Sequence, residues 1–325
     1  MRVNNLARYD IFISCHVVIP TSKPARRQAF PVVPQRRPPQ LTHVRSQANN
    51  TMPTTTLDGT STQVRVDLST ELSLDQLQKF PAFRIWLSNL TKSLQQQQQT
   101  SHPFHQLPYT LRSIKVQAVD FFGGERLGFV KLKAEISNDD GEVLPGSVFL
   151  RGGSVAMLLI LHADSSSEEY VVLAIQPRIA AGSLSFVELP AGMLDDSGTF
   201  TGAAAKEIKE ETGLDIEEKD LVDMTELVFR DRTQEQSSDE HHLQKGIYPS
   251  PGGCDEFIPI FMARKRMSAD EIEALKGKLT GLREHGEKIT LKICRLDELW
   301  KVGARDGKTL SAVSLYEGLS REGKI

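Results

Sequence analysis

The sequence has little cysteine and no long apolar run. Its three cysteines, Cys15, Cys254 and Cys294, lie far apart without a CxxC pair, so they provide neither a disulfide framework nor a zinc site. No stretch of 18 consecutive apolar residues occurs, and we therefore expect no membrane-spanning helix. Positive charge is not in excess, because the formal net charge is −3, which argues against nucleic-acid binding through bulk charge. With 39% hydrophobic residues in 325 positions, the chain has enough apolar material for a sizeable core.

Acidic residues are almost absent from the first 57 positions, where seven Arg and one Lys accompany a single acid, Asp10. This region is rich in Pro, Ser, Thr and Asn, so we expect residues 1–60 to form a disordered tail. An Arg-rich, acid-poor N-terminus also fits a transit peptide, which would place the protein in the mitochondrion. A plain tail on a cytoplasmic protein is the alternative, and the composition leaves both open.

The region 64–150 combines helical and strand patterns. Large apolar residues recur at roughly helical spacing across residues 74–90, and Pro81 should kink or divide that helix. The glutamine run at 95–99 predicts a loop. Two alternating stretches flank the sequence GGER at 123–126, which predicts a β-hairpin. We therefore expect a small α+β region before the main domain.

Strand and helix patterns alternate from residue 151 onward, and the result should be a mixed sheet with helices on its faces. The segment VAMLLILHA, residues 155–163, is almost continuously apolar, which is typical of a strand buried on both faces. Ser268 and Glu271 have the spacing of a capping box at the start of a helix. Residues 308–323 predict a last helix. Its expected apolar positions are Leu310, Val313, Leu315 and Leu319.

Three carboxylates crowd one helical stretch. Glu207 and Glu211 are four residues apart and share a helix face, with Glu210 beside them. Like charges at such spacing repel one another unless a cation binds between them, and hard oxygen ligands suit Mg²⁺ or Mn²⁺. The glycine loop before the helix allows backbone carbonyls to approach the same ion. A solvated charged face, neutralised by Lys206 and Lys209, is the alternative interpretation of this segment.

The stretch from Gly192 to Leu214 resembles the Nudix box. That pattern is Gly, five residues, Glu, seven residues, then Arg-Glu-aliphatic-any-Glu-Glu-any-Gly-aliphatic. Two positions depart from it, because Gly198 stands in place of the Glu and Lys206 in place of the Arg. The resemblance implies that the metal is held by the carbonyl of Ala191 and by the carboxylates of Glu207, Glu210 and Glu211.

Further motifs between residue 110 and the end resemble the plant-type ADP-sugar diphosphatases of the Nudix superfamily. They include VDFFG, VFLRGGSVAMLLIL, ELPAGMLDD, PSPGGCDEFIPIF and GLREHGE. The resemblance implies a Nudix-type α/β/α sandwich over residues 151–325, preceded by the α+β region. It also implies a homodimer, in which residues 64–150 form the dimer contact.

The same resemblance implies the remaining site residues. An acid after the SPGG sequence belongs to the active site, and we favour Glu256 over Asp255, with Glu210 and Glu211 as its catalytic companions. The substrate-binding residues would be Arg178, Arg151, Gly252 and Gly253. For Arg178 and Glu256 an exposed surface position is the alternative, and for Arg151 the alternative is a simple ion pair with an acid. Glu188 would bind metal or hold the glycine loop, and His285 fits a turn better than a substrate contact.

Two functions of different class follow from these features. The first is Mg²⁺-dependent hydrolysis of the diphosphate bond of an ADP-sugar, such as ADP-ribose or ADP-glucose, to AMP and a sugar phosphate. The second is a Nudix-fold module that binds a nucleotide-sugar as a sensor without cleaving it. The complete set of three glutamates favours the enzyme, whereas Lys206 keeps the sensor open. Neither interpretation includes a nucleic acid or a membrane as a partner.

Overall fold

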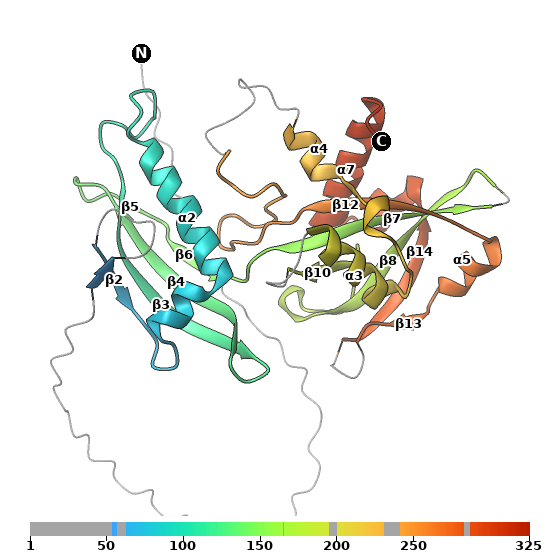
Figure 1. Cartoon of the computed structure of the whole chain (residues 1–325), viewed down its shortest axis with the longest axis horizontal. Coiled ribbons are helices and arrows are strands. Elements are labelled where there is room, and N and C mark those ends of the chain that lie inside the picture. The colour runs from blue at the N-terminus through green and yellow to red at the C-terminus, as the bar shows by residue number, and fades with distance from the viewer. Residues whose placement is uncertain (1–53, 57–62, 165, 195–199, 231–240, 283–286) are drawn as a thin grey trace, which may run out of the picture. The chain divides into compact units, whose positions relative to one another are not determined.

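The computed structural model contains two β-sheets and the helices that pack on them (Figure 1). The predicted tail, residues 1–60, lies outside the described ranges except for one short strand. No helix in the described ranges combines the length and the apolar character that a membrane crossing requires. The structure describes residues 54–56, 63–164, 166–194, 200–230, 241–282 and 287–325.

The first sheet has the strand order β1-β2-β3-β4-β5, and β6 pairs with β4. Strands β2 and β3 run parallel, and the other pairs are antiparallel. The predicted hairpin is confirmed, because Gly123 and Gly124 adopt positive φ angles of 60° and 98° between β3 and β4. The strands are β1 Thr54–Thr56, β2 Gln63–Asp67, β3 Thr110–Phe122, β4 Arg126–Ser137, β5 Val143–Leu144 and β6 Ser147–Leu150.

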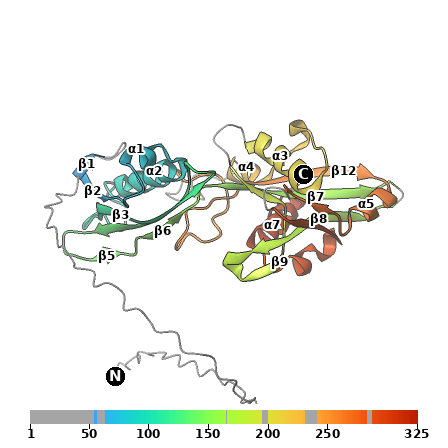
Figure 2. The same cartoon turned by 90° about the horizontal axis from the view of Figure 1, so that it is seen from below.

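Two helices cover the buried face of this sheet. Helix α1 spans Leu74–Lys79 and helix α2 spans Pro81–Gln96, so the predicted division at Pro81 is confirmed. Phe80 between them has an extended backbone, and Pro81 takes the first helical position, where its missing N–H costs nothing. Both views show α2 lying along the strands of the sheet (Figures 1 and 2).

The expected loop at the glutamine run is partly wrong, because α2 continues through Gln96. Gln97 is 3% exposed. Its side-chain amide donates to the carbonyls of Leu94 and Tyr109 and accepts from the backbone N–H of Tyr109. These hydrogen bonds hold the turn that follows α2. Gln97 is therefore part of the packed structure and not of a solvated glutamine tract.

The second sheet has the order β11-β12-β7-β8-β14-β13, with β10 beside β7 and β9 beside β8. It is mixed, because β7 and β12 run parallel whereas the other pairs are antiparallel. Its strands are β7 Ser154–Ala163, β8 Glu169–Arg178, β9 Ser183–Glu188, β10 Ala191–Met193, β11 Val222–Asp223, β12 Ile260–Met267, β13 Leu279–Thr280 and β14 Ile289–Arg295.

Helices cover both faces of the second sheet. Odd-numbered residues of β7, such as Met157 and Leu159, pack in one core cluster with α3 and α5, whereas Leu158 and Ile160 pack in the other with α4, α6 and α7. The predicted α/β/α arrangement with a mixed sheet is therefore confirmed. The helices are α3 Phe200–Thr212, α4 Met224–Arg230, α5 Ala269–Leu275, α6 Leu299–Val302 and α7 Gly307–Arg321, with 3-10 turns η1 Ile179–Ala181, η2 Glu218–Asp220 and η4 Leu296–Glu298.

Two predicted helix features have different outcomes. The capping box at Ser268 and Glu271 is present at the start of α5. On α7, however, the expected apolar position Leu310 is 42% exposed, whereas its neighbour Thr309 is fully buried. The buried face of α7 consists of Thr309, Ala312 and Leu319.

The first sheet ends at Leu150 and the second begins at Ser154. The division of the chain into a region 64–150 and a domain 151–325, and the assignment of the first to dimer contacts, stay predictions.

Candidate active site

A cavity of about 660 Å³ lies where the ends of β8, β9 and β10 meet the middle of α3 and the start of α7. The loop before β12 also lines the cavity, as do Phe129 on β4 and Arg151 before β7. Segments far apart in the chain thus contribute to one site. Of the predicted site residues, the cavity brings together Arg151, Arg178, Ala191, Glu207, Glu211 and Glu256.

Other predicted residues do not line this cavity. Glu210 is half-buried on α3 but is absent from the cavity wall, and Gly252 and Gly253 are exposed and line a different cavity beside α2. Their roles in metal or substrate binding stay predictions. Gly198 and His285 lie outside the described residues.

Gly192 is required by the position of Glu207. A methyl group built on the Gly192 α-carbon would overlap the carboxylate of Glu207. The overlapping atoms are the tip of the Glu207 side chain, so a side chain at position 192 would push this carboxylate away from its present position. The first glycine of the box thus has a direct physical function, which is to admit a carboxylate against the backbone.

Glu211 is buried with its charge facing other acids. It is 1% exposed, and Oε2 accepts a hydrogen bond of 3.0 Å from the backbone N–H of Ala191. Burial raises its pKa well above the ordinary value, and the carboxylates of Glu207, Glu287 and Glu188 raise it further, against the opposing effect of the Ala191 hydrogen bond. The ionised form of Glu211 is unfavourable here unless a positive charge comes close.

This donor set fits a hard divalent cation. Within the described ranges, no three His, Cys, Asp or Glu side chains are already arranged as a complete metal site. Glu207 and Glu211 nevertheless face one cavity with oxygen donors, the ligand type that Mg²⁺ and Mn²⁺ prefer. A cation between them would remove the repulsion that destabilises the charge of Glu211. The residues therefore match a divalent cation by the type of ligand atom that they offer.

The two acids after the SPGG sequence have different surroundings. Asp255 accepts hydrogen bonds from the backbone N–H groups of Arg151 and Gly152, which fixes the loop before β7. Burial raises the pKa of Asp255, and these backbone hydrogen bonds oppose the rise. Glu256 instead lines the cavity, where its Oε1 accepts from Ser154 Oγ at 2.8 Å and from Arg151 Nη1 at 2.9 Å. The geometry therefore gives Asp255 a structural contact and Glu256 a place in the cavity wall.

Glu188 is held between two cations. Its side chain is 2% exposed; Oε1 accepts from Arg178 Nε at 2.6 Å, and Oε2 accepts from Lys308 Nζ at 2.7 Å. Because both oxygens are already paired, Glu188 is better placed to hold the cavity wall than to bind a metal. This favours the prediction that Glu188 holds the glycine loop over the prediction that it binds a metal.

Lys308 and Asp306 complete this network. Asp306 Oδ1 accepts from Lys308 Nζ at 3.0 Å, and Oδ2 accepts from the backbone N–H of Leu189 and from the hydroxyl of Thr309. Burial alone would lower the pKa of Lys308, but the carboxylates of Asp306 and Glu188 outweigh it and raise that pKa. Through Leu189, the start of α7 thereby anchors the chain that leads into the glycine loop.

Sequence reasoning missed Asp306 and Lys308. For Asp306 a signal existed, because an Asp directly before a helical segment is a common N-cap, and Asp306 accepts from the N–H groups of Lys308 and Thr309. Nothing in the local sequence distinguishes Lys308 from the other lysines of the chain. Only the packing of α7 against Glu188 gives Lys308 its place in the site.

The chain matches a domain family, a named relative and a solved structure. The NUDIX domain family model matches residues 153–312. "Nudix hydrolase 14, chloroplastic" of Arabidopsis thaliana is 41% identical over 245 residues, which cover 75% of this chain and 72% of that protein. Among solved structures, "Crystal structure of ADP compounds hydrolase" is 16% identical over 66% of this chain and 99% of that chain. Its TM-score of 0.38 is too low to bear on the fold or activity of this chain.

The identity to the Arabidopsis protein is high and extends over most of both chains. Nudix hydrolases generally use divalent metal ions, which agrees with the carboxylates of the cavity. From the matching domain and this relative, we conclude that the chain belongs to the Nudix hydrolase family.

Proposed function

We propose that this Nudix hydrolase cleaves the diphosphate bond of ADP-sugars, such as ADP-ribose or ADP-glucose, to AMP and a sugar phosphate with the help of Mg²⁺ or Mn²⁺. The observation that carries the proposal is that Glu207 and Glu211 line the same cavity as Glu256 and Arg178. The ADP-sugar as substrate rests on the motifs of the sequence, above all ELPAGMLDD and PSPGGCDEF.

The carboxylates of Glu207 and Glu211 would hold the metal, with the Ala191 carbonyl and Glu210 as further predicted ligands. A bound divalent ion neutralises charge on the diphosphate and lowers the pKa of a bound water. Glu207 is positioned for this task by the missing side chain at Gly192, and Glu211 by its hydrogen bond from Ala191 N–H.

The cationic side chains of the cavity would bind the phosphate groups. Arg178 uses Nε for Glu188, so its two Nη groups are the donors that remain to face a phosphate. Arg151 uses Nη1 for Glu256, and its Nε is buried without a hydrogen-bond partner among the described residues. Nε has less than 1 Å² of exposed surface, so Nη2 is the Arg151 donor that remains for a phosphate oxygen.

Glu256 is the proposed general base. Ser154 and Arg151 both donate to Oε1, which fixes the carboxylate and directs proton transfer to Oε2. In this proposal Oε2 accepts the proton of the attacking water, and the Glu256 side chain then carries that proton away from the phosphate.

The test is AMP release from ADP-ribose and ADP-glucose with Mg²⁺, with nucleotide-sugar binding measured in parallel. We expect both substrates to yield AMP, EDTA to abolish the release, and added Mg²⁺ or Mn²⁺ to restore it. An AMP-sugar without a diphosphate should stay intact. Tight binding without any AMP would contradict hydrolysis and favour the sensor, in which case Lys206→Arg would be the first change to examine.

We also infer that the protein is imported into an organelle, with the mitochondrion as the compartment that the Arg-rich N-terminus predicts and the cytoplasm as the alternative. The Arabidopsis relative is named as chloroplastic. Fusing residues 1–60 to a fluorescent protein tests the inference: organellar fluorescence supports it, and diffuse cytoplasmic fluorescence contradicts it.

A further inference from the structure

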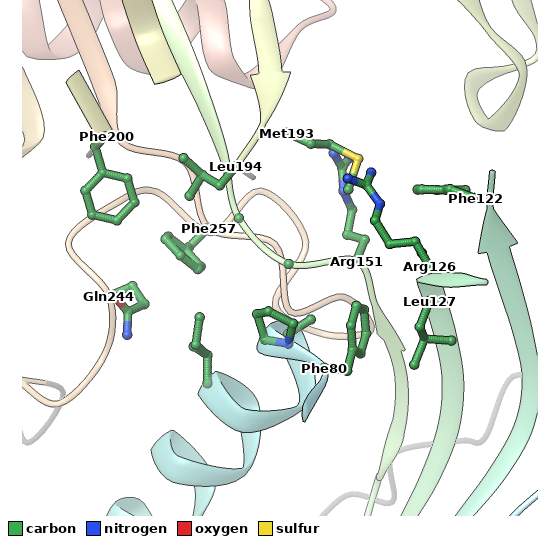
Figure 3. Close-up of a pocket in the computed structure, with 16 residues that line it drawn as sticks. Phe80, Phe122, Arg126, Leu127, Arg151, Met193, Leu194, Phe200, Gln244 and Phe257 are labelled. Carbon is green, nitrogen blue, oxygen red and sulfur yellow. The ribbon is translucent and has the colours of Figure 1, made fainter. Parts of the chain in front are cut away.

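A second cavity, of about 520 Å³, adjoins the candidate active site (Figure 3). It is bounded by the start of α2, the β3–β4 hairpin and the loop that contains Phe257. Arg151 and Met193 line both cavities, so the two share a wall. In Figure 3, Arg126 and Arg151 are seen at one end of the second cavity, and Phe200, Phe257 and Gln244 at the other.

The two cavities differ in charge. The second cavity has no Asp or Glu among its described lining residues. The first is lined by six carboxylates, from Glu188, Glu207, Glu211, Glu256, Glu287 and Asp306. The charged side chains of the second cavity are Arg126 and Arg151, which lie at one end, and Arg151 also lines the first cavity. Metal-bound phosphates therefore belong in the first cavity and near these arginines, whereas an uncharged, apolar part of the same ligand belongs at the other end of the second cavity.

Aromatic side chains form one end of the second cavity. Phe257 is 3% exposed, and a methyl group on Gly153 would come within 2.6 Å of its ring, so the missing side chain at Gly153 lets the ring pack against the backbone. Phe200 meets Phe257 edge-on, with ring centroids 6.5 Å apart and an angle of 89°. Phe200 itself is 41% exposed, so an exposed aromatic ring is available for a planar ligand to stack on.

Gln244 supplies a polar group at the same end. Its backbone N–H donates to the hydroxyl of Tyr248 at 3.2 Å, which positions the residue. Its side-chain amide has no hydrogen-bond partner within the described part of the chain. A glutamine amide combines a donor and an acceptor, the pair that recognises N6 and N7 of adenine bidentately.

We propose that the second cavity is the subsite for the adenine base of the substrate, with Phe200 as the stacking ring and Gln244 as the group that recognises the base edge. The proposal rests on the proposed function, because it assigns the nucleoside part of the same substrate. The shared wall at Arg151 and Met193 lets the base lie in one cavity while the diphosphate lies in the other.

Binding to the full chain, measured by calorimetry without catalysis, tests the proposal. The probes are AMP, UMP and ribose 5-phosphate, which carries the phosphate but no base. The variants are Gln244→Ala and Phe200→Leu, and the matched controls are Gln98→Ala and Phe104→Leu, whose exposed side chains lie outside both cavities. We expect each cavity variant to bind AMP about tenfold more weakly, while the affinity for ribose 5-phosphate stays unchanged. Wild-type protein should prefer AMP over UMP.

Wild-type AMP affinity in both cavity variants would overturn the proposal, as would an equal loss for AMP and ribose 5-phosphate. Phe200→Leu keeps an apolar side chain, and Gln244 is not part of the core, so unfolding is not expected to obscure the result. Failure of the proposed function alone would give a different result. AMP would still bind more weakly to Gln244→Ala than to the wild type, but no ADP-sugar would be cleaved.

Discussion

The carboxylate of Glu207 lies against the α-carbon of Gly192, so closely that a side chain at position 192 would overlap it. This contact joins the glycine loop to α3 and sets how far Glu207 reaches into the cavity.

Gly192→Ala should therefore displace Glu207 and lower turnover of an ADP-sugar by about a hundredfold, because a small misplacement of a catalytic ligand has effects of that size. Steady-state kinetics at saturating Mg²⁺ measures the loss. Gly318→Ala is the matched control, since nothing lies within 4 Å of the added methyl group. It sits inside α7, and we expect a gain of about 0.5–1 kcal/mol in stability with normal turnover. Normal turnover in Gly192→Ala would contradict the assigned role of Glu207.

Glu211→Gln should lower turnover by about a hundredfold while the protein stays folded, because a metal ligand loses its charge. It should also change the pH dependence of stability. Burial and Glu207 raise the pKa of Glu211 above its ordinary value of 4.5 in the folded state. Its contribution to the free energy of unfolding is therefore fully present below that value and is lost as the pH rises through the folded-state pKa.

In EDTA, thermal melts from about pH 5 to about pH 8 should thus show a decline in wild-type stability that Glu211→Gln reduces. Glu273→Gln, at an exposed position, is the control and should leave the decline unchanged. A wild-type curve and a Glu211→Gln curve of equal slope would contradict this account.

Lys308→Met should destabilise the protein by about 3 kcal/mol, because it removes one of the two cations that neutralise buried Glu188. Denaturant unfolding measures the change. Combining it with Glu188→Gln should recover part of the loss, since the uncompensated charge is then absent. Lys219→Met breaks an exposed ion pair with Glu217 and should cost less than about 1 kcal/mol. If Lys308→Met and Lys219→Met lowered the free energy of unfolding equally, burial of the Glu188 ion pairs would not contribute to stability.

Removing residues 1–51 should leave turnover and melting temperature nearly unchanged, because that segment has too little apolar content to pack. Kinetics and calorimetry of the shortened and full-length chains test this. A clear drop in melting temperature would make the segment part of the fold.

A two-fold homodimer is the expected assembly, built largely from residues 64–150. Val143 at 64% and Phe149 at 37% exposure place apolar surface on the first sheet, which a dimer contact would cover. Light scattering at micromolar concentration should give twice the chain mass of 36.2 kDa. A mass of one chain would contradict the prediction.

Regular patterns predict the fold well where one physical effect dominates. Pro81 divides a helix because it lacks an N–H, and Ser268 starts one because its side chain caps it, so both features are visible in the sequence. The burial of Gln97 is not visible in the sequence, and the prediction for Leu310 is wrong, because long-range contacts decide burial at both positions. Gln97 is held inside by hydrogen bonds with the backbone of Tyr109. Thr309 takes the place of Leu310 on the buried face because the Thr309 hydroxyl donates a hydrogen bond to Asp306.

The candidate site shows the same limit. Glu207 and Glu211 are four residues apart on one helix, so their spacing alone predicts that they lie together. The resemblance to the Nudix box adds Gly192. The network of Arg178, Glu188 and Lys308 joins β8, β9 and α7, and only tertiary packing brings these residues together. Local spacing cannot predict such a contact.

The hydrogen bond from Leu189 N–H to Asp306 also bears on how the protein is made. Asp306 and Lys308 come later in the chain than every other segment of the cavity, and synthesis proceeds from the N-terminus. The sheets and the glycine loop can therefore emerge from the ribosome and begin to fold while Glu188 still lacks one of its two cations. Glu188 gains its second cation, and the glycine loop its anchor, only after α7 has been synthesised.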